Sequence, residues 1–364
     1  MPDELRQEEF ELLARIAHRY YVDDSTQEEI AREFGLSRPK VQRLLDRARR
    51  AGVVDIHIQA PPGLNLDLED DLRRTFHLAD AIVGPPRSDP QSQREAVARC
   101  AARYLERRVS NGSVVAVSHG RDTGELPRFF RTERRVDCTF VSAMGGSPRV
   151  DAPTNPNEIC RALAERSGGR AVSLYAPAYV ERPDIRDELL EQEAVAHTLG
   201  LAAHADIALV GIGGTDDDCT MVRSGCLSVD EMARLRSQGA VGDVLGNYVD
   251  ILGRPVSSPH QERLIALTVE DLRRIGTAVA VVSEAEKPRA VLGVLRSGVV
   301  DVLVIDEPNA RALLALARED GLPGDAQRED VIPGVPREDV VPGALPREAE
   351  AGRAQSREVV DQGV

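Results

Sequence analysis

The sequence predicts an α/β fold class, in which an N-terminal winged helix-turn-helix precedes a doubly wound domain built on a mostly parallel sheet. Near the N-terminus, two short amphipathic helical segments are separated by Gly35, which interrupts the helical pattern. Farther along the chain, short runs of β-branched residues alternate with amphipathic helical segments. That alternation is typical of a parallel sheet buried on both faces.

Composition and net charge narrow the class of protein. The chain has 364 residues, 42% of them apolar and 29% charged, and is long enough for more than one hydrophobic core. Its formal net charge of −14 disfavours a protein that coats nucleic acid non-specifically, because the field of the whole molecule repels phosphate. Any DNA binding must therefore come from a local basic element.

The sequence offers no signal for a membrane segment or a metal site. No apolar run approaches the ~20 residues needed to cross a bilayer, and the acidic, amphipathic N-terminus does not resemble a signal peptide. The five cysteines include no CxxC pair, and the seven histidines form no HxH or HExxH set. We expect a cytoplasmic protein without a membrane segment, a cofactor or a metal.

Four segments are expected along the chain. Residues 1–59 form the helix-turn-helix domain, and residues 60–66 form a linker that contains Ala60-Pro-Pro-Gly63. Residues 67–320 form the α/β domain. Residues 321–364 are rich in proline, glycine and acidic residues and contain a Pro-Gly-terminated repeat that starts at Arg328 and again at Arg337. We expect this last segment to be a disordered tail.

The elements of the N-terminal unit follow from helical spacing and capping residues. Apolar residues at helical spacing predict a first helix: Phe10, Leu13, Ile16 and Ala17. Ser25 is expected to cap a second helix, and Ser37 a third that starts at Arg38. The third helix is expected to bury one apolar stripe: Val41, Leu44, Leu45 and Ala48. Residues 53–58 alternate like a short strand, the expected wing.

The third helix has the features of a DNA-recognition helix. From Arg38 to Arg50 it carries six basic residues against one acid, Asp46. In helix-turn-helix proteins the start of this helix enters the major groove, while the preceding helix crosses the backbone. Because Arg and Lys donate to guanine edges and Gln pairs with adenine, five residues are candidate base contacts: Ser37, Arg38, Lys40, Gln42 and Arg43. Thr26 and Gln27 are candidate phosphate contacts. We expect double-stranded operator DNA as partner, bound by a homodimer or homotetramer, since paired recognition helices match paired half-sites.

Six apolar runs are expected to form the strands of the α/β domain: residues 114–118, 139–143, 172–175, 207–212, 278–282 and 301–305. In such sheets ligands bind beyond the carboxyl ends of the strands, so the turns that follow are the candidate site. The first turn is Ser118-His-Gly-Arg-Asp-Thr123. Its Gly120 backbone, Arg121 and the hydroxyls of Ser118 and Thr123 suit a phosphate at a helix N-terminus. Glycines in later turns permit close backbone approach: Gly145, Gly146, Gly211 and Gly213.

The order of these segments resembles the SorC/DeoR-type sugar-binding regulators, whose effector domain is similar to phosphosugar isomerases. The resemblance covers residues 10–316 and rests on the helix-turn-helix and on motifs in family order: Val115-Ala-Val-Ser-His-Gly120, Ala143-Met-Gly-Gly146, Leu174-Tyr-Ala-Pro-Ala178, Ala208-Leu-Val-Gly-Ile-Gly213, Gly239-Ala-Val-Gly-Asp243 and Asp301-Val-Leu-Val-Ile-Asp306-Glu-Pro. It implies a DNA-binding transcription regulator controlled by a small effector, with a phosphorylated sugar as the expected ligand.

Three charged residues enter the candidate effector site through this resemblance. Lys287 follows the strand at residues 278–282, where related regulators place a lysine that contacts an effector phosphate. Lys287 is one of two lysines among 46 basic residues, which favours a need for a compact ammonium at that position. Asp243 closes its motif and is expected to accept sugar hydroxyls. Arg223 is expected either to contact an anion or to be an ordinary surface residue.

Two departures from the family pattern leave alternatives open. Asp122 stands where relatives often have Thr or Ser, and residues 283–286 replace a commonly Gly-rich approach to the lysine and add two acids. These changes are compatible with a less charged sugar or polyol as effector, or with a regulator that has lost sensing. A further alternative is an isomerase-like enzyme with Asp243 or His119 as base. A helix-turn-helix has little role in an isomerase, so we predict a regulator and not an enzyme.

Overall fold

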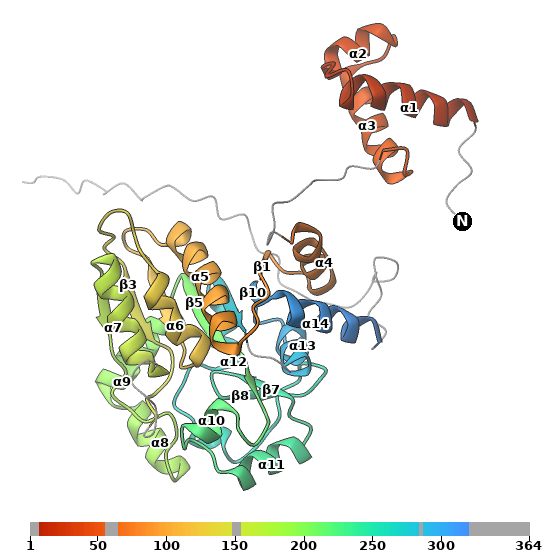
Figure 1. Ribbon diagram of the computed structural model, residues 1–364. Coiled ribbons are helices and arrows are strands. Elements are labelled where there is room, and N and C mark those ends of the chain that lie inside the picture. Colours follow the sequence, from red (N-terminus) through yellow and green to blue (C-terminus); the bar gives the residue numbers. More distant parts are fainter. Residues whose placement is uncertain (1–6, 55–64, 148–153, 284–286, 320–364) are drawn as a thin grey trace, which may run out of the picture. The chain divides into compact units, whose positions relative to one another are not determined.

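The computed structural model describes residues 7–54, 65–147, 154–283 and 287–319 (Figure 1). The expected tail at 321–364 and residues 60–64 of the expected linker lie outside these ranges, as do residues 55–58 of the expected wing. Within the described part, no helix combines the length and the apolar character needed to span a membrane.

The N-terminal unit contains three helices: α1 (Gln7–Tyr21), α2 (Gln27–Glu33) and α3 (Arg38–Arg50). They enclose a small core to which each helix contributes, with Ile16, Ile30 and Leu45 almost fully buried. Gly35 adopts φ +67°, which turns the chain between α2 and α3 in a conformation that other residues adopt at a cost.

Two details of this unit differ from the sequence prediction. The residue that caps α2 is Thr26, not Ser25, because a capping box forms in which Thr26 and Glu29 exchange hydrogen bonds. Ser37 occupies the cap position of α3, but its side chain makes no capping hydrogen bond.

The α/β domain is built on a seven-stranded sheet with the order β1-β10-β9-β5-β2-β3-β4, and every pairing in it is parallel. Its strands are β1 (Asp80–Gly84), β2 (Val114–Val117), β3 (Thr139–Ser142), β4 (Arg170–Val172), β5 (Ile207–Gly211), β9 (Thr277–Val282) and β10 (Val302–Asp306). A small antiparallel sheet follows β5 and consists of β6 (Gly213–Gly214), β7 (Gly242–Val244) and β8 (Asn247–Val249).

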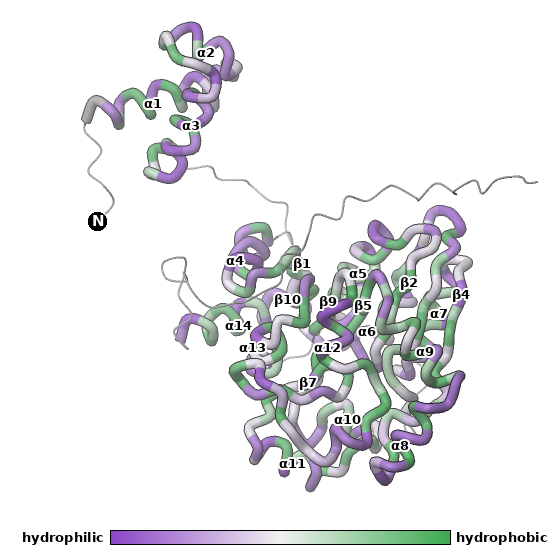
Figure 2. Tube along the Cα trace, turned by 180° about the vertical axis from the view of Figure 1, so that it is seen from behind, coloured by the Kyte–Doolittle hydropathy of each residue, from purple (hydrophilic) through white to green (hydrophobic). Residues whose placement is uncertain are grey.

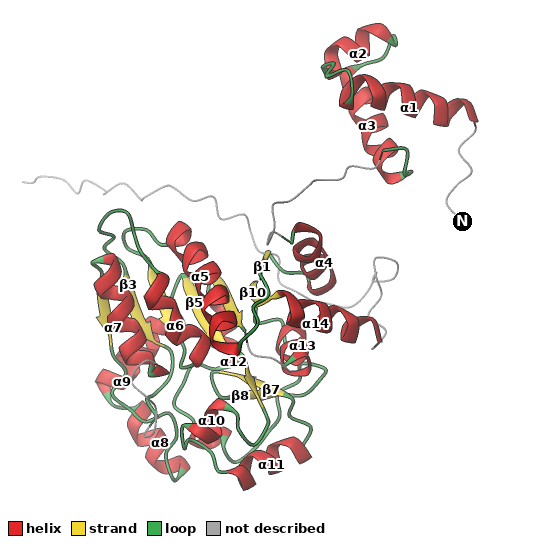
Figure 3. Ribbon diagram, in the orientation of Figure 1, coloured by secondary structure: helices red, strands yellow, loops and turns green. Residues whose placement is uncertain are grey.

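Helices cover both faces of the large sheet (Figure 3). One face packs against α5 (Pro90–Arg108), α6 (Arg121–Phe129) and α7 (Pro156–Ser167). The other face packs against α4 (Leu66–Phe76), α9 (Glu193–Ala203), α12 (Val269–Arg274), α13 (Pro288–Arg296) and α14 (Glu307–Glu319). The remaining helices are α8 (Pro183–Leu190), α10 (Thr220–Arg223), α11 (Val229–Ser237) and the 3₁₀ turn η2 (Gln261–Arg263). The strands are mostly hydrophobic and the hydrophilic stretches lie outside them (Figure 2), as a doubly wound sheet requires.

Five of the six predicted strands match observed strands to within a residue or two, and the predicted doubly wound architecture is confirmed. The predicted strand at residues 172–175 is displaced, because β4 ends at Val172. β1 and the small antiparallel sheet were not predicted.

The chain order reverses at the centre of the large sheet. From β2 the chain proceeds outward through β3 to β4, and then returns to β5 on the opposite side of β2. Such a switch leaves a crevice beyond the carboxyl ends of the two central strands, because the connections diverge to opposite faces. The fold therefore places a candidate site at the ends of β2 and β5.

Candidate functional site

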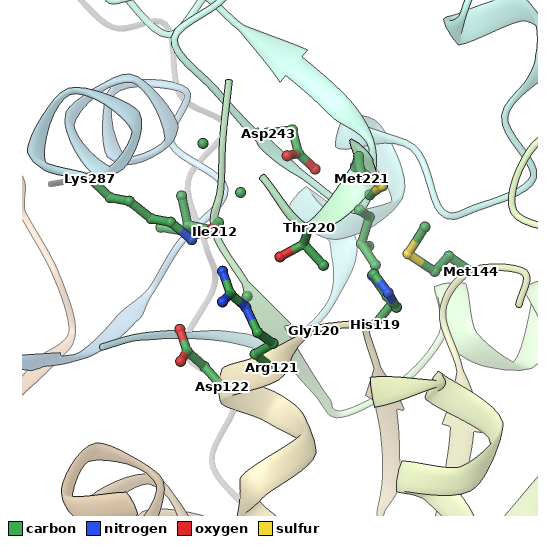
Figure 4. Close-up of a pocket in the computed structure, with 14 residues that line it drawn as sticks. His119, Gly120, Arg121, Asp122, Met144, Ile212, Thr220, Met221, Asp243 and Lys287 are labelled. Carbon is green, nitrogen blue, oxygen red and sulfur yellow. Dashed lines mark hydrogen bonds between the residues drawn. The ribbon is translucent and has the colours of Figure 1, made fainter. Parts of the chain in front are cut away.

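A cavity lies where the sheet topology predicts it, at the carboxyl ends of β2 and β5 (Figure 4). Its lining consists of His119, Gly120, Arg121, Asp122, Met144, Gly211, Ile212, Gly213, Gly214, Thr220, Met221, Asp243, Leu245 and Lys287. Six of the residues predicted from the sequence are in this lining: Gly120, Arg121, Gly211, Gly213, Asp243 and Lys287. The cavity thus brings together residues from six different segments of the chain.

Five other predicted residues do not line the cavity, and two of them are the hydroxyl residues Ser118 and Thr123. The Ser118 hydroxyl accepts a hydrogen bond from the Gly211 N–H at 3.0 Å and donates to the His119 carbonyl at 3.1 Å. The Thr123 hydroxyl donates to the Gly120 carbonyl at 3.3 Å. The Thr123 hydroxyl therefore stabilises the turn between β2 and α6 from within, and the Ser118 hydroxyl attaches the turn to β5. A direct effector contact by either one stays a prediction.

The remaining predicted residues outside the lining are Gly145, Gly146 and Arg223. A Cβ atom at Gly145 would lie 2.3 Å from the Pro177 carbonyl oxygen, and Gly146 donates its N–H to the Ala176 carbonyl at 2.9 Å. The close backbone approach expected at these glycines is thus made by another segment of the chain. Arg223 is exposed and pairs with Asp218 through two hydrogen bonds of 2.6 Å.

Asp243 is a buried carboxylate at the cavity wall. Its Oδ2 accepts a hydrogen bond from the Gly246 N–H at 2.9 Å, whereas its Oδ1 has no hydrogen-bond partner among the residues that the structure describes. Burial raises the pKa of Asp243 to about 6, although the Gly246 N–H and the positive charge of Lys287 act in the opposite direction. A Cβ atom on Gly213 would lie 1.9 Å from Oδ1, so glycine at that position makes room for the carboxylate.

Lys287 supplies a cation on the opposite side of the cavity from His119 (Figure 4). It occupies the cap position of α13, and its Nζ donates to the Ile212 carbonyl at 3.2 Å, just beyond the end of β5. Lys287, which the sequence singled out in part because lysine is rare, therefore lines the cavity. Its hydrogen bond to the Ile212 carbonyl, at the edge of the sheet, holds its side chain there.

His119 was not among the predicted effector contacts, yet it is buried in the cavity lining. Burial lowers its pKa to about 4, so the imidazole is neutral near pH 7. Its Nε2 atom has no hydrogen-bond partner among the described residues. A neutral imidazole with a free nitrogen can donate or accept one hydrogen bond to a ligand hydroxyl. Its position one residue before Gly120, at the end of a strand, is the signal that could have identified it.

In the N-terminal unit, the structure places the predicted DNA-binding side chains on α3 and at the start of α2. Ser37, Arg38, Lys40, Gln42 and Arg43 are exposed. Gln27 donates from Nε2 to the Gln42 Oε1, so an amide of α2 is joined to an amide of α3. The Thr26 hydroxyl is occupied in its capping box with Glu29. The exposed surface of α3 therefore carries positive side chains and the Gln42 amide, which is hydrogen-bonded to Gln27. Cationic and amide side chains are the groups that read base edges.

Comparison with known proteins identifies the family of the chain. The Sugar-bind family model, described as "Putative sugar-binding domain", matches residues 61–315. The transcriptional regulator LsrR of Klebsiella pneumoniae is 32% identical over 318 residues, which cover 85% of this chain and 94% of LsrR. The chain belongs to the SorC/DeoR family of transcriptional regulators.

Two further relatives extend this family assignment. EryD, the erythritol catabolism regulatory protein of Brucella abortus, is 30% identical over 307 residues, covering 83% of this regulator and 96% of EryD. The crystal structure of the full-length sorbitol operon regulator SorC from Klebsiella pneumoniae matches with a TM-score of 0.66 at 27% identity, over 85% of this chain and 100% of that structure. The predicted family is confirmed, and the protein is a transcription regulator, not the isomerase-like enzyme that was the alternative.

Removal of one cation from α3 should weaken specific DNA binding by this regulator. We expect Arg43→Ala to cost about 1–3 kcal/mol of specific binding, roughly five- to 150-fold in Kd, if Arg43 contacts a base edge. Fluorescence anisotropy on labelled operator DNA measures this loss. Arg15→Ala on α1, where the exposed side chain pairs with Glu11, is the matched control. Equal losses for both variants would indicate a non-specific charge effect.

Proposed function

We propose that this regulator binds double-stranded operator DNA through α3 and the start of α2, and that a small phosphorylated sugar or related carbohydrate in the cavity controls its affinity for the operator. The observation that carries the proposal is the composition of the cavity. It combines a helix N-terminus and a lysine ammonium with a buried carboxylate and a neutral imidazole. The first pair suits a phosphate, and the second pair suits sugar hydroxyls.

The phosphate end of the ligand is assigned to the start of α6. The first amides of a helix lack intrahelical acceptors and point outward, and the helix dipole favours an anion there. Gly120 and Arg121 begin this helix, and Lys287 adds a positive charge to the cavity lining. We expect these three residues to hold the anionic group.

The hydroxyl end of the ligand is assigned to the other wall. The Asp243 Oδ1 accepts hydrogen bonds, the His119 Nε2 donates or accepts one, and the Thr220 hydroxyl faces the same space (Figure 4). The apolar side chains of Met144, Met221 and Leu245 complete this part of the lining. Small-molecule sites commonly combine a few placed polar groups with such apolar surface.

The relatives support a carbohydrate as the class of effector. Their names refer to erythritol catabolism, to a sorbitol operon and to deoxyribonucleosides. We infer that this regulator likewise controls genes for the use of a sugar or polyol.

Control of DNA binding requires a ligand that distinguishes two states of the protein. We propose a homodimer or homotetramer, because paired recognition helices match paired half-sites. The effector then changes operator affinity only by as much as it binds more tightly to one arrangement of the subunits than to the other.

Fluorescence anisotropy tests this function directly. The purified protein is titrated onto DNA from upstream of its own gene, with and without sugar phosphates, free sugars and polyols. We expect specific binding that a phosphorylated member of the panel shifts by at least roughly fivefold, the lower end of ordinary allosteric coupling. A shift by free sugars alone would replace the phosphate assignment. Specific DNA binding that no ligand shifts would favour a regulator without sensing.

A further inference from the structure

The two departures from the family pattern in the effector domain are in direct contact. Asp122 is the second residue of α6 and Ser283 follows the last residue of β9, 161 positions later in the chain. The Ser283 hydroxyl donates to the Asp122 Oδ1 at 2.5 Å, and the Ser283 backbone N–H donates to Oδ2 at 3.2 Å. One carboxylate therefore holds both donors of a single residue.

The charge of Asp122 is also compensated. Arg94, on α5, places its Nε 3.5 Å from the Asp122 Oδ1, and only 13% of the Arg94 side chain and 7% of the Asp122 side chain are exposed. Removal of one partner from a buried pair of this kind is costly, because it leaves the other charge uncompensated. Asp122 thus does not act as the isolated acid that would repel a phosphate.

The location of this cluster links the two anion-binding elements of the cavity. Asp122 adjoins Arg121 at the start of α6, where the effector anion is expected. Ser283 lies where the chain leaves β9, and Lys287 begins α13 four positions later. β9 pairs with β5, whose continuation at Ile212 accepts the Lys287 Nζ hydrogen bond. A carboxylate that bonds to Ser283 from α6 therefore fixes the end of β9, four positions before Lys287 in the chain.

We propose that Asp122 is a positioning residue, which holds the β9 exit through Ser283 so that Lys287 and the α6 N-terminus face the same effector anion. This inference rests on the proposed function, because it concerns the anion site of that cavity. In this proposal Asp122 helps to position Lys287 and does not contact the effector. Arg94 supplies the positive charge that balances Asp122.

Two variants separate this role from a general effect on folding. Ser283→Ala removes the hydroxyl donor and keeps the backbone hydrogen bond. Asp122→Asn keeps the size of the side chain but removes the charge, and its combination with Arg94→Gln restores neutrality. Asp184→Asn is the control, because Asp184 is exposed on α8 and pairs with Arg182.

The scarcity of lysine provides a direct readout. A sample labelled with ¹³C in lysine carries the label at two residues, Lys40 and Lys287, and a Lys40→Arg version assigns the two Cε signals. We expect the Lys287 signal to move in Ser283→Ala and Asp122→Asn while the Lys40 signal stays in place. Binding of inorganic phosphate, measured by calorimetry, should weaken about tenfold in Asp122→Asn, which removes the charge from both hydrogen bonds to Ser283, and about threefold in Ser283→Ala, which removes one of the two. Asp184→Asn should change neither signal nor affinity.

The outcomes distinguish the positioning role of Asp122 from the proposed function of the cavity. Normal phosphate affinity and an unmoved Lys287 signal in Ser283→Ala and Asp122→Asn would overturn the positioning role and leave the proposed function intact. Failure of the wild-type protein to bind phosphate or sugar phosphates would overturn both. If Asp122→Asn does not fold, Ser283→Ala and the neutralised double variant still carry the test. A fall in thermal stability without any effect on Lys287 or phosphate would reduce the cluster to a structural contact.

Discussion

Replacement of Lys287 by methionine should abolish the response to the effector while operator binding without ligand remains at the wild-type level. Lys287 contributes an ammonium to the cavity wall, and methionine keeps an unbranched side chain as far as Cε but removes the ammonium. A hydrogen bond to a charged group contributes about 1.5–3 kcal/mol, so effector affinity should fall roughly ten- to a hundred-fold. Anisotropy on operator DNA, titrated with the active ligand, measures both quantities in one experiment.

Arg289→Met is the appropriate control for this variant. Arg289 is exposed, lies two positions after Lys287 and borders a neighbouring hollow that Lys287 also lines. If the overall positive field attracts the ligand, both variants should lose affinity to a similar extent. If contact is decisive, only Lys287→Met should lose it. An unchanged dose response in Lys287→Met would return this lysine to the class of ordinary surface residues.

The sequence predicted those parts of the cavity that depend on residues close together in the chain. Apolar β-branched runs bounded by glycine identify β2 and β5, and the rules of parallel sheets place the site at their carboxyl ends. The position of Lys287 after a predicted strand, read through the family resemblance and supported by the rarity of lysine, singled out this residue. β1 was missed because Asp80–Gly84 is a short run that starts with an acid and ends with glycine, a weak strand signal on its own.

What the sequence did not reveal depends on contacts between distant segments. The position of His119 before Gly120 marks it as a candidate lining residue, but its burial, which lowers its pKa, depends on elements that are distant in the chain. Asp122 was interpreted as an acid that repels phosphate, because its partners Arg94 and Ser283 come from other elements of the fold. Ser118 and Thr123 have suitable hydroxyls at the right turn, yet Ser118 bonds to β5 and Thr123 bonds to the Ser118 carbonyl within the turn.

The second large effect concerns Asp243, for which we expect a variant that is more stable and less functional. The pKa of Asp243 is raised from 3.8 to about 6 by burial, so the folded protein binds this proton more tightly than the unfolded chain does. Its contribution to stability is therefore complete below the unfolded pKa and is lost as the pH rises through about 6. Above that range the protein bears the cost of a buried carboxylate, about 3 kcal/mol for a shift of this size.

Asp243→Asn should remove that cost and its pH dependence together. Urea unfolding at pH 8 should show a gain of up to about 3 kcal/mol over the wild type, and the gain should shrink as the pH falls through 6. His119, whose pKa is lowered to about 4, titrates in the acidic part of the range in both proteins, so their difference isolates Asp243. Asp187→Asn, an exposed carboxyl on α8, is the control.

The same substitution should weaken effector binding, because an amide presents a donor or a single acceptor where the carboxylate Oδ1 accepts from ligand hydroxyls. A buried charge that lowers stability at neutral pH is expected where its function requires the charge. A stabilised Asp243→Asn protein that still responds fully to its ligand would contradict this role and leave Asp243 as a structural acceptor for the Gly246 N–H. A variant that is stabilised equally at pH 5 and pH 8 would instead show that the gain comes from packing and not from the charge.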